Sequence, residues 1–124
     1  MSVGEMNQNG EEMRRLSSLI DDALEELKRF AVDLAESENR YRHSRSKAWG
    51  MVSKTTDDGV KRLAAEIEAE VDELTADLRF ARDRADYLRQ VALEAVRSRR
   101  QQLSAWQSWV AAERAEAEFV RTSP

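Results

Sequence analysis

Apolar or small residues recur along the first half of the chain at alternating steps of three and four positions. A repeat of roughly 3.5 residues is typical of a helix that packs along another helix. The members of this first series are Met13, Leu16, Ile20, Ala23, Leu27, Phe30, Leu34, Ser37, Tyr41, Ser44, Ala48 and Met51. The pattern predicts a first helix over about residues 11–52.

The same spacing returns after residue 60. The members of this second series are Ile67, Val71, Leu74, Leu78, Ala81, Ala85, Leu88, Ala92 and Ala95, then Leu103, Trp106, Val110, Glu113, Ala117 and Val120. Between the two parts the series passes through Arg99 by two successive steps of four, a slip that locally unwinds a supercoil. Because neither Gly nor Pro occurs between Gly59 and Pro124, we expect one helix over about residues 60–121. The alternative is a chain that folds back near Arg99, with the tryptophans in an ordinary core.

The segments outside these helices are short. Residues 1–10 are polar, contain two glycines and follow no pattern, which predicts a disordered lead. Residues 53–59, SKTTDDG, predict a turn, because their Thr and Asp side chains suit the start of the following helix. The sequence therefore predicts an all-α fold, an antiparallel hairpin of two long helices resembling a coiled coil, in a single domain over residues 11–121.

Charge supports the antiparallel direction. If the chain reverses near residue 57, residues 40–47, with four cationic side chains, lie opposite residues 66–77, with six acidic ones. The acidic segment 21–36 lies opposite segment 79–94, which has a net positive charge. Single exposed ion pairs contribute little energy, but flanking charges select orientation and register.

The same reversal leaves the end of the second helix uncovered. Met13 would lie opposite about residue 101, so residues 102–120 would have no neighbour in the chain. Soluble proteins rarely leave such apolar patches open, and Trp residues often anchor interfaces. We therefore predict that this overhang binds another protein or a second copy of the chain, in a helical bundle. The candidate interface residues are Leu103, Trp106, Trp109, Val110, Ala117, Phe119 and Val120.

Composition argues against an enzyme. Charged residues make up 35% of the chain, Cys is absent, and the one histidine, His43, has no Glu three positions before it, as helical di-metal sites require. We therefore expect no catalytic, cofactor or metal site and no small-molecule substrate. The first ten residues lack the features of a signal peptide, and no apolar run approaches the roughly 18 residues of a membrane span. A cytoplasmic protein that does not enter membranes is expected.

Nucleic-acid binding is the alternative function. The net charge of −4 offers no overall attraction to phosphates, so such binding would need a local basic face. The candidates are Arg84, Arg89, Arg97, Arg99 and Arg100. The competing interpretation is that these arginines balance acidic residues of the first helix.

A resemblance adds a biological context. Tyr41, the turn at residues 55–59, the pairs Leu103-Ser104 and Gln107-Ser108, and the segment 114–116 are similar to features of small helical proteins of tailed bacteriophages, including phages of actinobacteria. The resemblance covers about residues 41–118, and the tryptophans at 106 and 109 depart from it. It implies an accessory role in phage recombination or replication, or a host-interaction factor, in the host cytoplasm. It carries over no catalytic residue.

Overall fold

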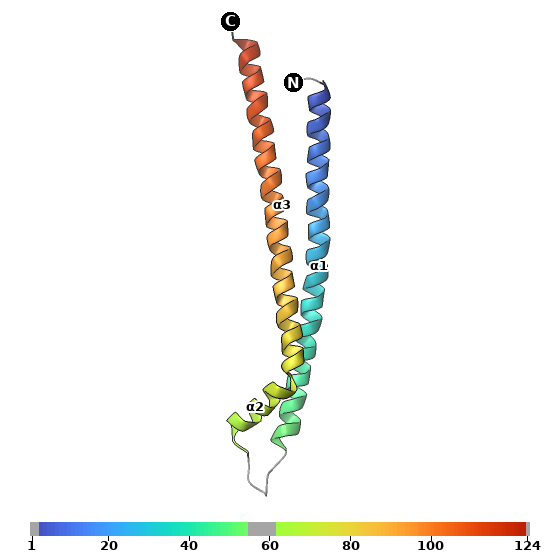
Figure 1. The fold of residues 1–124 in the computed structure, drawn as a ribbon, viewed down its shortest axis with the longest axis vertical. Coiled ribbons are helices and arrows are strands. Elements are labelled where there is room, and N and C mark those ends of the chain that lie inside the picture. The colour runs from blue at the N-terminus through green and yellow to red at the C-terminus, as the bar shows by residue number, and fades with distance from the viewer. Residues whose placement is uncertain (1–2, 55–61, 124) are drawn as a thin grey trace. The chain divides into compact units, whose positions relative to one another are not determined.

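The computed structural model describes residues 3–54 and 62–123 and consists, in these ranges, of three helices without strands. They are α1 (Val3–Ser53), α2 (Ala64–Leu74) and α3 (Ala76–Thr122). Helices α1 and α3 pack against each other, as Figure 1 shows. The predicted all-α helical hairpin is confirmed. Most of the predicted turn, from residue 55 to residue 59, lies outside the described residues.

The chain divides into two compact units, each of which contains a part of α1 and a part of α3. One unit, here the tryptophan unit, combines α1 up to Leu27 with α3 from Val91. The other, here the tip unit, covers residues 28–90 and so includes α2. The two units are described separately below.

The first helix buries the face that its sequence pattern predicts. We call the buried face of each long helix its seam. From Leu16 to Ala48 every predicted seam position is buried or half-buried. The series departs from the prediction at its end, where Val52 is 5% exposed and Met51 is 65% exposed. A four-residue step from Ala48 to Val52 therefore replaces the expected step of three.

Helix α1 begins earlier than predicted. Residues 3–10, expected to be part of a disordered lead, form the first turns of α1, while residues 1–2 lie outside the described range. Asn9 and Gly10 are half-buried, and Asn9 precedes Met13 and Leu16 by steps that continue the seam spacing. The prediction was wrong because a polar, glycine-containing segment is stabilised by packing that its composition does not reveal.

The predicted second helix is interrupted at Thr75. It begins at Ala64 rather than at residue 60, and α2 ends at Leu74, after which α3 leaves in a different direction, as Figure 1 shows within the tip unit. The Thr75 side chain is 1% exposed, and its hydroxyl donates a hydrogen bond of 2.7 Å to the Val71 carbonyl. Hydroxyls that bond back to the previous turn bend helices. Neither Gly nor Pro is needed for this break.

The slip in the repeat lies at Thr75, not at Arg99. Ile67, Val71 and Thr75 are all buried and follow one another by two steps of four. Beyond Thr75 one series of buried or half-buried positions alternates steps of three and four: Leu78, Arg82, Ala85, Arg89, Ala92, Val96, Arg99, Leu103, Trp106 and Val110. Asp86, Leu88 and Leu93, beside this series, are half-buried as well, and Leu88 was part of the predicted one. Leu74, Ala81 and Ala95, which the sequence placed in the seam, are exposed. Helix α3 continues through Arg99 as predicted, and the chain does not fold back there.

Three of the seam positions of α3 are arginines, and of these Arg82 and Arg89 lie outside the predicted series, whereas Arg99 lies in it. Long arginine side chains can cover apolar surface with their methylene groups while the guanidinium stays near water. The Arg82 guanidinium lies 4.5 Å from the centre of the Tyr41 ring on α1, in a cation–π contact. Arg89 is half-buried, with one amino group 3.8 Å from Asp86 on the same helix.

The tip unit contains a compact apolar cluster where α2 meets the end of α1. Ala48, Val52, Ile67 and Val71 are buried there, and Trp49 packs against them. Beside this cluster Arg45 of α1 lies 2.6 Å from Asp72 and 3.7 Å from Glu68 of α2. The opposition predicted between the basic segment 40–47 and the acidic segment 66–77 is therefore observed.

The position of the slip can be tested by truncating two neighbouring residues. Thr75→Ala removes a buried methyl group and a hydrogen bond, so we expect it to lower the free energy of unfolding by about 1–2 kcal/mol. Leu74→Ala, at an exposed position, should change it by less than about 0.5 kcal/mol. Urea unfolding followed by circular dichroism measures both. A larger loss of stability for Leu74→Ala than for Thr75→Ala would show that Leu74, and not Thr75, lies in the seam.

The early start of α1 predicts a stabilising substitution at Gly10. An added Cβ would meet only the end of the Arg14 side chain, at 3.9 Å. Alanine in place of a glycine inside a helix should therefore raise the free energy of unfolding by about 0.5–1 kcal/mol. Gly50→Ala, inside a helix and with open space around it, is the matched control. A gain for Gly50→Ala without one for Gly10→Ala would mean that the helix does not extend to residue 10.

Candidate functional site

The ionisable residues of the tip unit pair mainly with one another. His43 is exposed, and acidic residues of α2 contact arginines: Asp72 and Glu68 contact Arg45, and Glu70 contacts Arg62. The hydrogen bond that Arg45 donates to the Asp72 carboxylate raises the pKa of Arg45 above its ordinary value. Within residues 3–54 and 62–123 no group of three or more His, Asp or Glu side chains is arranged to hold a metal ion.

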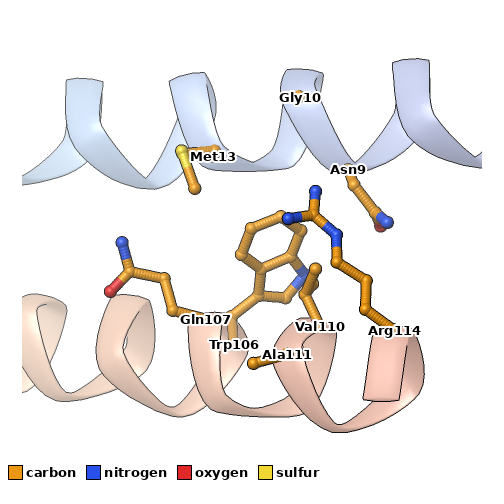
Figure 2. A pocket seen from close by; sticks show the side chains of 8 residues that line it. All are labelled: Asn9, Gly10, Met13, Trp106, Gln107, Val110, Ala111 and Arg114. Carbon is orange, nitrogen blue, oxygen red and sulfur yellow. The ribbon is translucent and has the colours of Figure 1, made fainter. Parts of the chain in front are cut away.

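The tryptophan unit contains a hollow between the beginning of α1 and the later part of α3. It has a volume of about 410 Å³. Figure 2 shows the Trp106 ring pointing from α3 toward α1 within this hollow. The lining residues are Asn9, Gly10 and Met13 from α1, and Trp106, Gln107, Val110, Ala111 and Arg114 from α3. Val110 is 7% exposed.

This arrangement corrects the predicted overhang. Residues from 102 onward were expected to have no neighbour in the chain, yet Trp106 and Val110 pack beside the first turns of α1, and Leu103 is half-buried. Met13 lies near Trp106 and Val110 instead of near residue 101. The prediction was wrong because α1 is longer than its pattern indicates and covers these positions.

The remaining predicted interface residues are exposed. Trp109 is 53% exposed, Phe119 71% and Val120 68%, and Ala117 is also exposed. Ala117 and Val120 continue the seam spacing of α3 beyond Val110, whereas Trp109 and Phe119 lie beside the seam. The two neighbouring tryptophans therefore have different surroundings, since Trp106 packs within the hairpin and Trp109 faces outward.

Asn9, Gly10 and Met13 complete this site, and of these only Met13 was part of the predicted pattern. The position of Asn9 was predictable from spacing although its side chain is polar, because it lies four residues before Met13 and so continues the alternation of steps. Gly10 carries no comparable signal. Its backbone lines the hollow beside Trp106.

The five candidate arginines for nucleic-acid binding do not share one face of α3. Arg89 and Arg99 are half-buried seam residues, and Arg99 donates a hydrogen bond of 3.3 Å to Gln102. Arg97 is exposed and pairs with Glu94 at 2.7 Å. Arg84 and Arg100 are exposed, but the helical spacing places them on opposite sides of the seam. A continuous basic track for phosphates is not formed by these residues.

No helix in the described ranges is both long enough and apolar enough to cross a membrane. Comparisons of the chain with models of known protein families, with curated proteins and with solved structures gave no significant match.

The different surroundings of the two tryptophans predict different effects on stability. Trp106→Ala leaves the hollow beside Met13 without its largest side chain and should lower the free energy of unfolding by about 2 kcal/mol. Trp109→Ala should change it by less than about 0.5 kcal/mol in the isolated chain. Urea unfolding at concentrations where light scattering gives a monomer mass tests both. Equal losses would contradict the outward placement of Trp109.

Proposed function

We propose that this chain is a non-enzymatic helical interaction protein whose docking surface is the exposed face at the end of α3. The observation that carries this proposal is the exposure of Trp109, Phe119 and Val120 within the last four turns of that helix. Large apolar side chains at such exposure are costly in water, and Trp residues are frequent anchors of protein interfaces. The surface acts through self-association or by docking another protein.

The limited core supports the same proposal. The described ranges contain nine buried apolar residues, and three of them are alanine: Leu16, Ala48, Val52, Ile67, Val71, Ala85, Ala92, Val96 and Val110. A hairpin of two helices buries little apolar surface, and assembly into a larger bundle adds to it. A partner that binds the folded chain and not the unfolded chain raises the free energy of unfolding.

The biological setting that we propose is a bacteriophage, on the strength of the resemblance around Tyr41 and residues 103–116. The chain would then act in the host cytoplasm as an accessory factor in recombination or replication, or by contacting a host protein. A DNA-binding role is less well supported, because Arg89 and Arg99 are half-buried and Arg97 is paired within its own helix.

The proposal predicts that Trp109 controls association. Light scattering on a sizing column, over a range of concentrations, measures the mass of the full-length chain. Trp109→Ala should raise the concentration needed for association at least about tenfold, as expected for an interface anchor. Val32→Ala is the matched control, because Val32 is also an exposed apolar residue, at 56%, but lies on α1.

A chain that stays monomeric is tested by a photo-crosslinking amino acid at position 109, introduced in cells that make the full-length protein. Attachment to one defined protein, absent when the same group is placed at position 32, supports docking of a different partner. An associating chain whose mass is insensitive to Trp109→Ala would overturn the proposed surface, as would the absence of any attachment to a monomeric chain.

A further inference from the structure

Helix α3 carries a second regular series of positions beside its seam. In the tryptophan unit these positions also alternate steps of three and four, without interruption from Val91 to Phe119. The members are Val91, Ala95, Ser98, Gln102, Ala105, Trp109, Ala112, Glu116 and Phe119. All nine are exposed, and six of them are apolar, although apolar residues at this spacing are the pattern by which one helix packs along another. We call this series the flank stripe.

The flank stripe is nearly free of charge. Glu116 is its one charged residue, in a chain of which 35% of the residues are charged. The opposite flank of the same part of α3 is different, and its charged members are Arg97, Arg100, Arg114, Glu118 and Arg121. A helix flank that faces only solvent can carry charged residues freely, so solvent exposure does not account for the difference in charge between the two flanks. A partner helix packed on the uncharged flank accounts for it.

We propose that a second copy of this chain covers the flank stripe, with the two α3 helices antiparallel and the twofold axis near residue 100. This inference rests on the proposed function and names the partner of that surface. In this register Val91 faces Trp109 of the second copy, Ala95 faces Ala105, and Ser98 faces Gln102. Large residues meet smaller ones, and the alanines let the two helices approach closely. A twofold interface requires such self-complementarity, because each residue pair occurs twice.

Charge favours this register over its neighbours. Continuing outward along α3, residues equally far from residue 100 include Arg84 and Glu116, which therefore face each other with opposite charges. A shift by one heptad in either direction would place Glu116 opposite Val91 or opposite Asp77. The first leaves a carboxylate against an apolar residue, and the second brings two carboxylates together.

A hollow in the tip unit provides independent support. It has a volume of about 220 Å³ and lies between α1 and α3, with Arg84 and Asp33 among its lining residues. Its apolar lining consists of Phe30, Phe80, Ala81, Ala85 and Leu88. The register centred on residue 100 places Phe119 of the second copy opposite Ala81, at this hollow. Phe119, 71% exposed in the single chain, thus has an apolar site to enter.

Cysteine crosslinking tests the arrangement directly, because the natural chain has no cysteine. The full-length double variant A95C/A105C should form a disulfide-linked dimer under mild oxidation, since each new thiol faces the other position of the second copy. Within one chain the two positions lie ten residues apart, or about 15 Å along the helix, which is too far for a disulfide. A mixture of the two single variants should give the mixed dimer.

The single variants are the matched controls. Positions 95 of two antiparallel copies are also about 15 Å apart along the axis, so A95C alone should remain uncrosslinked. Efficient self-crosslinking of A95C would indicate parallel helices and overturn the proposed register. The absence of crosslinks in the double variant, with a monomer mass for the natural chain, would overturn self-association. Attachment of another protein at position 109 would then leave the proposed function intact.

Charge reversal gives a second measurement that does not depend on thiol chemistry. The variant R84E and the variant E116R should each raise the dissociation constant of the dimer about fivefold, because two facing pairs become like-charged. The double variant R84E/E116R should restore the natural value to within about twofold. Sedimentation equilibrium measures all four proteins. Additive losses in the double variant would contradict the pairing of these residues.

Discussion

The placement of Thr75 decides which side of α3 meets α1. A repeat of four and three residues fixes the rotation of a helix about its axis, so a slip at one point changes the exposure of every residue beyond it. Here the slip coincides with a buried hydroxyl that bonds to the previous turn. From that point to Val110 the seam continues without further correction. The inward position of Trp106 and the outward position of Trp109 both follow from it.

This dependence explains what the sequence could and could not predict. The seam of α1 was predictable, because its positions from Leu16 to Ala48 are mostly apolar or small and no second apolar series with the same spacing lies beside them. The hairpin and its direction were predictable too, since Arg45 and its acidic partners on α2 lie in segments of opposite charge. In α3, however, two series of positions are plausible. Leu74 and Ala81 are more apolar than Thr75 and Arg82, yet Leu74 and Ala81 are exposed, whereas Thr75 is buried and Arg82 is half-buried.

The preference for the less apolar series has a physical basis in the rest of the hairpin. Val96 belongs to the chosen series and is 2% exposed, whereas Ala95 contributes little surface to bury. The arginines add their methylene groups to the seam, and Arg82 also gains the Tyr41 ring. The beginning of α1 could not be read from composition, because Asn9 and Gly10 are half-buried through packing and not through apolar character. The candidate interface residues therefore fall into two groups, those that pack within the hairpin and those that remain exposed to solvent.

The cluster at the tip has a consequence for the order in which the hairpin folds. Ala48 and Val52 of α1 pack with Ile67 and Val71 of α2, which follow them in the chain by at most 23 residues. Closing a short loop costs less conformational entropy than closing a long one, and local contacts form fastest. Pairing of the helices therefore loses the least conformational entropy when it starts at the tip, and it then proceeds toward the two ends of the chain. The contact of Met13 with Trp106, which closes a loop of more than ninety residues, forms late and opens first.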